Sequence, residues 1–582
     1  MSWQSHAPWL RRLATVLWPV GLVTWVFVRF APLGYNPTDD GYVISQARRI
    51  LLGEVPHRDL VSPRPLGSAL LHVLDFAVPL PLLEASRLVA LVEFTGYSLL
   101  FAWLVYRRPP GTWGPAHVLG AAGSTMVNLH AFPLMSWQTT DGLTCLAAGM
   151  VLLEVGLERD RRGLLRVGLL CLGAAGLMKQ SFLPALPLGL VRVGWGRRRM
   201  GWWPWVRAMI AAGVLLAAPL LAYGGFVAAL GGVEAMRAQL SAPVPPFVRE
   251  LLGVFKAEPT RSAVMRRLSM ILGLLVAVRL LRWGARRAAR RAAALGTLAQ
   301  VAVRGWLSFV VVGIALNGRL LYDGGWAAEL VWALVVVLLI EAIADRVLDG
   351  PGLVLLAAAW MTQLSWGYAF PNLIAGSVAL CVLHRIWLGL DVSFTRPWLL
   401  RLPLEFGALA LAALVISTFV DTRKLASYSD EPEPRLTFPL STVAPAFGRI
   451  RTNPTTGRYL EELATCVRRY PARWVAVLPD NPGLYPALHL DNPFPLDRMY
   501  PLEVQGSERR IVEAARTLDE RGDYLVLFQT VSAYELAWRK DIAMATPESA
   551  PFFRSPLGAE IRDHLHGQRV ACGSFVGAYD PR

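Results

Sequence analysis

Two adjacent carboxylates near the start of the chain have the residue types that acid–base chemistry requires. The stretch reads Thr38-Asp39-Asp40-Gly41-Tyr42 and follows an apolar segment. A carboxylate held beside a hydroxyl group can take its proton as the hydroxyl oxygen attacks. Carboxylates at the mouth of a membrane helix are costly unless they are solvated or used. The competing interpretation is a solvated helix start, where acidic side chains are favoured by the helix dipole, and these residues alone leave both interpretations open.

The composition is that of a membrane protein. Of the 582 residues, 54% are hydrophobic and only 17% are charged, whereas soluble domains carry about 25% charged residues. Apolar blocks close to the length of a bilayer span recur over the first 420 positions, so a signal peptide does not account for them. The net charge is +16, yet residues 421–582 hold 20 Lys and Arg against 21 Asp and Glu. The positive excess therefore lies in short loops of the membrane part, which fits cytoplasmic loops and predicts no nucleic-acid partner.

The hydropathy pattern predicts about thirteen membrane segments. They lie near residues 13–32, 82–106, 113–131, 142–157, 163–178, 181–195, 206–230, 268–284, 305–321, 326–345, 351–371, 373–390 and 402–420. An odd number places the two ends on opposite sides, and the Arg-rich loops are expected in the cytoplasm. We predict a multi-pass protein of the inner or plasma membrane, with residues 285–300 cytoplasmic and residues 430–582 periplasmic or extracellular.

The first outer loop, residues 33–81, is long, and long loops in compact proteins tend to carry function. Residues 40–51 have the apolar spacing of an amphipathic helix, which Thr38 can cap. Residues 66–78 form a second apolar stretch that is too short to span a bilayer. We expect both stretches to be helices at the membrane interface.

The composition changes after Val420. Residues 421–456 are predicted to be a linker, and residues 457–582 alternate between helix and strand patterns, which predicts a small α/β domain. The expected helices are 458–469, 508–520 and 557–566, and the expected strands are 474–478, 524–528 and a last one near 570–576. Cys466 and Cys572 could form a disulfide if this domain lies outside the cytoplasm, but their spacing does not show proximity.

The first outer loop resembles that of the GT-C glycosyltransferases, which include protein O-mannosyltransferases and the transferases that place aminoarabinose on lipid A. In bacterial relatives this loop reads Asp-Glu-Gly-Tyr, an Ala-Arg-Arg helix, Gly-Glu-x-Pro-Tyr-Arg-Asp and Lys-Pro-Pro. This chain has Asp39-Asp40-Gly41-Tyr42, Ala47-Arg48-Arg49, Gly53-Glu54-Val55-Pro56-His57-Arg58-Asp59 and Arg64-Pro65-Leu66 in the same order. It departs from the pattern at Asp40 and His57, and in the last motif it keeps the positive charge but loses the second Pro.

The resemblance implies a polyprenyl-phosphate sugar as donor, reaction at the outer face of the membrane, and the first Asp of the loop as base. Asp39 is then the expected catalytic residue, with Asp40 beside it. The matching residues Tyr42, Arg58 and Asp59 are expected to bind substrate. A direct displacement at the anomeric carbon inverts its configuration.

Lys179-Gln180 closes the fifth predicted segment, and GT-C relatives often have Lys-Gln there, with the basic residue near the donor phosphate. A lone Lys at a helix end more often only extends to the interface. Taken with the loop, Arg64, Lys179 and Gln180 are expected to bind the donor, with the two cations clamping its phosphate. Residues 478–485 and 492–500 also resemble segments of GT-C outer domains, but a Pro-rich turn region explains them too, and no catalytic residue is predicted there.

The sequence thus predicts a mostly α, polytopic, GT-C-like membrane protein with a catalytic part at 1–420 and an outer α/β domain at 457–582. The expected activity is that of an inverting glycosyltransferase acting on a hydroxyl of a glycan, lipid or protein. The alternative is a transporter or flippase of lipid-linked sugars, which favours inverted repeats and broken helices that the sequence does not show. No cofactor is required by any motif. Asp39, Asp40 and Asp141 could hold a divalent cation, although no ligand spacing demands one.

Overall fold

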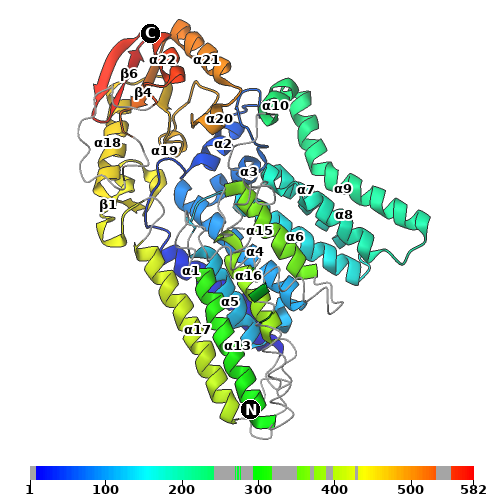
Figure 1. Ribbon diagram of the computed structural model, residues 1–582. Helices are drawn as coiled ribbons and strands as arrows, with labels where there is room; N and C mark the ends of the chain where they lie inside the picture. Colours follow the sequence, from blue (N-terminus) through cyan, green and yellow to red (C-terminus); the bar gives the residue numbers. More distant parts are fainter. Residues whose placement is uncertain are drawn as a thin grey trace.

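The computed structural model describes residues 8–130, 132–241, 293–316, 350–366, 372–387, 398–425, 430–531 and 552–582, with single positions between them. The protein is mostly helical, and a small sheet near the C-terminus lies at one end of the helical bundle (Figure 1). The predicted segments at 268–284 and 326–345 fall almost wholly outside the described residues.

Each remaining predicted membrane segment contains a helix. These helices are α1 (Pro8–Arg29), α4 (Leu82–Tyr106), α5 (Pro115–Leu129), α6 (Gln138–Glu158), α7 (Arg162–Met178), α8 (Ala185–Gly196), α9 (Trp202–Ala229), α13 (Ala293–Leu316), α15 (Gly350–Trp366), α16 (Ala375–Trp387) and α17 (Trp398–Leu425). Within the described residues, four are long and apolar enough to cross a membrane: α4, α6, α9 and Leu404–Leu425 of α17. The count of thirteen spans therefore stays a prediction.

Small residues let the central helices pack closely. A Cβ atom on Gly168 of α7 would lie 2.7 Å from the backbone nitrogen of Leu153 and 2.8 Å from the carbonyl oxygen of Gly149, both on α6. Such small-residue contacts are the usual means of helix association in lipid. By contrast, Trp202 and Trp203 of α9 are about 70% exposed, which suits a surface that faces lipid.

The first outer loop forms α2 (Tyr42–Leu51), α3 (Gly67–Leu71) and the 3-10 helix η2 (His72–Ala77). Helix α2 has no side-chain cap, so the predicted capping role of Thr38 is wrong: Gly41, with φ of 84°, precedes the helix, and the Thr38 hydroxyl donates to Asp480 instead. Only the C-terminal end of α2 is exposed, because the helix lies between the bundle and the C-terminal region (Figure 1).

The C-terminal sheet has the strand order β3-β4-β6-β5. Strands β3 (Trp474–Leu478) and β4 (Tyr524–Gln529) are parallel, with Val475 opposite Leu525. The predicted last strand is instead an antiparallel hairpin of β5 (Gln568–Cys572) and β6 (Phe575–Asp580), whose tight turn includes Gly573. The predicted helices are observed as α18 (Pro454–Arg469), α21 (Glu508–Arg521) and α22 (Pro556–Asp563).

Alternation along the strands divides the core of this region between two faces of the sheet. Val475, Val477 and Leu525 pack with residues of α18, whereas Ala476, Leu478 and Val526 pack with residues of α21 and α22. Successive side chains of a strand point to opposite faces of the sheet. A strand that is apolar at nearly every position therefore supplies core residues to both faces. A disulfide joins Cys466 of α18 to Cys572 of β5, which answers the question that their spacing left open.

Residues 430–453, inside the predicted linker, are packed rather than extended. The Asp430 carboxylate accepts hydrogen bonds from the backbone of Tyr35 at 2.8 Å and from Thr452 and Asn453 at 2.7 Å each. Short strands β1 (Phe438–Pro439) and β2 (Arg451–Thr452) pair here. This segment therefore joins the start of the first outer loop to the C-terminal region.

Short helices complete the described fold. They are η3 (Pro110–Thr112), η4 (Gln180–Phe182), α10 (Val233–Leu240), η7 (Asn372–Ile374), η8 (Glu433–Arg435), η9 (Leu440–Thr442), η10 (Pro445–Phe447), α19 (Leu484–Ala487) and α20 (Pro501–Val504).

Candidate active site

Asp39 lies against an arginine from the far end of the chain. Its Oδ1 atom accepts a hydrogen bond from the guanidinium of Arg498 at 2.8 Å, and the Asn36 amide donates to Oδ2 at 3.2 Å. Asp39 is only 4% exposed. The first outer loop and residues 492–500 therefore build one site together, although sequence reasoning placed no catalytic residue in the second segment.

Asp40 has different partners. Its carboxylate accepts hydrogen bonds from the backbone of Asn36 at 2.9 Å and from Arg87 of α4 at 3.2 Å. Burial raises the pKa of Asp40, and the charge of Arg87 opposes that shift only in part. Arg87 also donates to the carbonyl oxygens of Ala31 and Gly34. Asp40 thus fixes the loop to the bundle, while Asp39 faces the C-terminal region.

Glu503 of α20 connects the cations of the site. It accepts two hydrogen bonds from Arg64, at 3.0 and 2.8 Å, one from the Tyr42 hydroxyl at 3.1 Å and a long one from Arg498 at 3.5 Å. Burial would raise the pKa of Glu503, but the charges of Arg64 and Arg498 outweigh it and lower the pKa. The Arg498 guanidinium also lies 4.7 Å from the centre of the Tyr42 ring. The predicted residues Tyr42 and Arg64 are therefore brought together with Asp39.

Lys179 and Gln180 reach the same region from just beyond the end of α7. The Lys179 ammonium group donates to the Thr139 hydroxyl at 3.3 Å, and the Gln180 amide donates to the carbonyl oxygen of Pro63, next to Arg64, at 2.5 Å. Burial lowers the pKa of Lys179, and the positive charge of Arg64 lowers it further. Lys179 and Arg64 therefore lie close enough to interact through their charges, and their binding of a donor phosphate stays a prediction.

Asp480, which sequence reasoning missed, lies beside Thr38. It is fully buried; its Oδ2 atom accepts from the Thr38 hydroxyl at 2.9 Å and from the Tyr500 hydroxyl. Its Oδ1 atom has no hydrogen-bond partner within the described structure. Burial raises the pKa of Asp480 to about 6, although the charge of Arg498 opposes the shift. The signal that could have found it was the segment at 478–485, set aside as turns.

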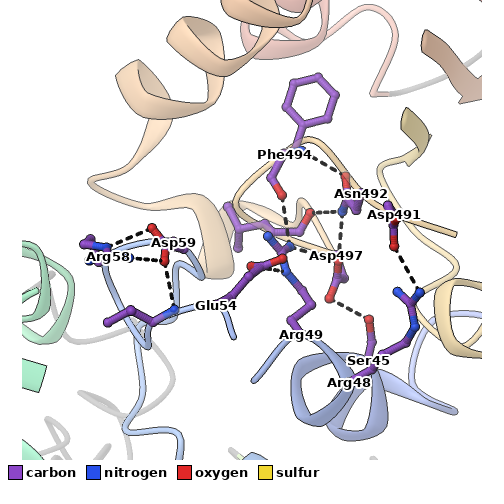
Figure 2. A network of polar contacts seen from close by, with 12 residues as sticks. Ser45, Arg48, Arg49, Glu54, Arg58, Asp59, Asp491, Asn492, Phe494 and Asp497 are labelled. Carbon is purple, nitrogen blue, oxygen red and sulfur yellow. Dashed lines mark hydrogen bonds and ion pairs between the residues drawn. The ribbon is translucent and has the colours of Figure 1, made fainter. Parts of the chain in front are cut away.

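Helix α2 is clamped to the segment that carries these residues (Figure 2). Ser45 donates to Asp497 at 2.5 Å, and Arg49 binds the same carboxylate at 3.1 Å and the carbonyl oxygen of Phe494 at 2.9 Å. Arg48 reaches Asp491 at 3.0 Å. The Ala-Arg-Arg helix of the loop therefore positions residues 491–500 over Asp39.

Two glycines permit this close approach. A Cβ atom on Gly41 would lie 2.4 Å from the Cα atom of Gly483, and one on Gly483 would lie 2.7 Å from the carbonyl oxygen of Asp40. Any side chain at either position would separate the two segments.

Arg58 and Asp59 lie elsewhere. They bind each other at 2.8 Å (Figure 2), and both are partly exposed. Arg58 also donates to the Leu230 carbonyl oxygen at 2.9 Å. The neighbouring His57 is buried between Gln239 and Tyr223, at 2.8 Å from each. The expected substrate-binding role of Arg58 and Asp59 stays a prediction.

The three carboxylates considered for a cation are divided between two places. Asp39 and Asp40 bind Arg498 and Arg87, whereas Asp141 lies with His72 and Glu93. Within the described residues, potential ligand atoms of these last three all lie within 4.8 Å of one another.

No protein-family model matches the chain, and no curated protein matches it. Among solved structures, the chain is similar to the arabinosyltransferase EmbB from Mycobacterium smegmatis, with a TM-score of 0.31 and 16% sequence identity. The similarity covers 60% of this chain and 40% of that one, so the chain spans less than half the length of the arabinosyltransferase. Because so weak a likeness carries no argument about chemistry, a function for this chain has to be argued from its own residues.

Proposed function

We propose that the protein is an inverting glycosyltransferase of the GT-C type that moves a sugar from a polyprenyl phosphate to an acceptor hydroxyl at the outer face of the membrane. The observation that carries this proposal is the pairing of a buried loop carboxylate, Asp39, with Arg498 in a site that also contains Arg64 and Lys179. Transfer from a phosphate donor needs both functions, a base for the acceptor and positive charge for the leaving group.

Asp39 acts as the base in this mechanism. The acceptor oxygen forms a bond to the anomeric carbon while its proton passes to Asp39. The bond between that carbon and the phosphate oxygen breaks with its electron pair on the oxygen, and polyprenyl phosphate leaves. Because attack and departure occur on opposite sides of the carbon, one displacement inverts the configuration.

The cations of the site stabilise the leaving phosphate. Arg64 presents two N–H groups to the Glu503 carboxylate in a forked geometry that a phosphate can also accept. A donor phosphate competes with Glu503 for Arg64 and Arg498, and its negative charge opposes the lowered pKa of Lys179 and favours the protonated form of that side chain. Before the donor binds, Glu503 keeps the guanidinium groups of Arg64 and Arg498 oriented.

In this proposal the membrane part, residues 1–420, and the outer domain, residues 457–582, both contribute side chains to the site. The disulfide between Cys466 and Cys572 favours an oxidising compartment for the outer domain. The donor then meets the site from the outer leaflet, where nucleotide sugars are not supplied.

The test is a transfer assay with purified protein, comparing polyprenyl-phosphate sugars with nucleotide sugars. We expect transfer only from the lipid donors, and a loss on the order of 10²-fold in Arg64→Ala and in Lys179→Ala. The double variant should lose less than the product of the two effects, since both residues serve one phosphate.

Arg509→Ala is the matched control, because Arg509 is an exposed arginine of α21 that pairs with Glu513 on the same helix. Robust transfer from a nucleotide sugar with Arg64 and Lys179 dispensable would overturn the mechanism. Movement of lipid-linked sugar across the membrane without transfer would favour a flippase.

A further inference from the structure

A second polar cluster lies inside the bundle, apart from the contacts of Asp39. It consists of His72 on η2, Glu93 in the middle of α4 and Asp141 in the first turn of α6, and one potential ligand atom of each lies within 4.8 Å of the others. The His72 and Asp141 side chains are fully buried, and Glu93 is 8% exposed. Three separate segments of the chain therefore bring donor atoms to one point.

Neighbouring side chains orient these ligands. Asp75 binds the Nδ1 atom of His72 at 3.0 Å, and Ser136 donates to Asp75 at 3.3 Å. The Nε2 atom of His72 is thereby directed at Asp141 Oδ1, 3.3 Å away. A carboxylate bound to the second nitrogen of an imidazole is the usual arrangement behind a metal-binding histidine.

The two carboxylates of the cluster differ in their contacts. The Ser68 hydroxyl donates to Asp141 Oδ2, which leaves Oδ1 directed at His72. The Oε2 atom of Glu93 is buried and has no hydrogen-bond partner within the described part of the chain. Two ligands of a tetrahedral zinc ion lie about 3.3 Å apart, so the observed separation of His72 and Asp141 suits two adjacent positions around one ion.

The charges of the cluster do not balance by themselves. Asp75, Glu93 and Asp141 are three buried carboxyl groups, and no Lys or Arg of the described residues forms an ion pair with any of them. A protonated His72 would offset only one of the three negative charges. Burying uncompensated charge is strongly unfavourable, so the cluster must take up either protons or a cation.

We propose that His72, Glu93 and Asp141 bind one divalent transition-metal ion, Zn²⁺ or Mn²⁺. The imidazole ligand favours Zn²⁺ and the two carboxylates also suit Mn²⁺, whereas Mg²⁺ and Ca²⁺ prefer oxygen ligands alone. The ion would fasten η2 to α4 and α6, and through Ser68 it would fix the start of α3, the helix that follows Arg64. Its role is to hold the first outer loop on the bundle, and the assignment does not depend on the transferase proposal.

The test is metal analysis of the full-length protein, purified with a tag that contains no histidine after growth with Zn²⁺ and Mn²⁺. Wild type should retain about one ion per chain, and His72→Ala and Glu93→Gln should lose about nine-tenths of it. Asp75→Asn should weaken metal affinity about 10- to 100-fold, as expected for a residue behind a ligand. His566→Ala is the control, since His566 also contacts an aspartate, Asp519, at 2.8 Å but on the surface.

A melting experiment on wild type covers the case in which the variants do not fold. A chelator should lower the melting temperature, and Zn²⁺ or Mn²⁺, but not Mg²⁺, should restore it. Wild type without bound metal and indifferent to the chelator would overturn the proposal in favour of a proton shared between Glu93 and Asp141. Metal content unchanged in both ligand variants would place the ion elsewhere and overturn it as well.

Discussion

At the scale of single residues, the neighbouring carboxylates Asp39 and Asp40 are distinguished by what they touch. Asp39 faces Arg498, and Asp40 faces Arg87 and the backbone of Asn36. Substitution of each should therefore affect a different property of the protein.

We expect Asp39→Asn to lower the transfer rate on the order of 10²- to 10⁴-fold, the usual contribution of a general base. Its melting temperature should stay near that of wild type, because Glu503 still accompanies Arg498. Asp40→Asn should mainly lower the melting temperature, since it leaves Arg87 buried without its carboxylate. Transfer rates and melting curves of both variants check this, and near-normal transfer by Asp39→Asn would remove it as the base.

The raised pKa of Asp480 predicts that the stability of the protein depends on pH. Its pKa is raised by burial to about 6 in the folded protein, against about 4 in an unfolded chain. The folded state binds more protons between these values, so the free energy of unfolding falls as the pH rises from about 4 through about 6, by about 3 kcal/mol for this group. Asp480→Asn removes this loss, and its melting temperature relative to wild type should rise over that interval.

Asp519→Asn is a control of opposite sign. Hydrogen bonds from Tyr524 and His566 outweigh the effect of burial and lower the pKa of Asp519, so its contribution to stability is present at neutral pH and lost in acid. From pH 4 to pH 7 the melting temperature of Asp480→Asn relative to wild type should rise, whereas that of Asp519→Asn should stay nearly constant and change only below about pH 4. A pH-independent difference between Asp480→Asn and wild type would contradict a raised pKa.

At the scale of elements, α2 is the piece that joins the two parts of the site. The sequence predicted its position and its apolar face, but its polar residues Ser45, Arg48 and Arg49 bind residues 490–497 rather than water (Figure 2). Helix α2 therefore holds in place the segment that carries Arg498 next to Asp39.

Two ion pairs of α2 allow a matched comparison. The Arg49 and Asp497 side chains are 7% and 1% exposed and 3.1 Å apart, whereas Arg48 and Asp491 are 14% and 49% exposed and 3.0 Å apart. A double-mutant cycle on Arg49→Ala and Asp497→Ala should give a coupling of about 1–3 kcal/mol. The cycle on Arg48 and Asp491 should give less than about 1 kcal/mol.

The measurement is the apparent free energy of unfolding of each single and double variant. Equal couplings for the two pairs would mean that burial does not govern the docking of α2.

At the scale of the whole molecule, the bundle and the C-terminal sheet meet around the first outer loop, and the chain begins at the opposite end of the bundle (Figure 1). This arrangement puts the proposed site where the helices end, next to the outer domain. The proposed function requires that the sheet and the Arg-rich loops lie on opposite sides of the membrane.

Cysteine labelling of intact cells tests that requirement. Glu508→Cys on α21 should react with an impermeant maleimide, and Arg199→Cys between α8 and α9 should not; both positions are exposed. Wild type supplies the background, since it carries the disulfide of Cys466 and Cys572 and the thiols of Cys145, Cys171 and Cys381. The reverse labelling pattern would place Asp39 in the cytoplasm and exclude a donor in the outer leaflet.

The sequence alone determined where most of the helices and strands lie. Apolar length marks helices such as α4 and α9, and short, nearly continuous apolar runs mark strands such as β3 and β4, because these patterns depend on neighbours within a few residues. Local motif order also indicated Asp39, Tyr42 and Arg64 as members of one site. Each of these features can be predicted without knowing what packs against it.

Only the tertiary structure decided which residues complete the site. Arg498 lies 459 positions from Asp39, Glu503 lies 439 from Arg64, and Asp480 lies 442 from Thr38. The same is true of the cluster of His72, Glu93 and Asp141, which no ligand spacing in the sequence marked. Contacts at such separations follow from the packing of whole elements rather than from any local pattern, and burial, which sets the charge state of groups such as Asp480, arises only when those elements come together.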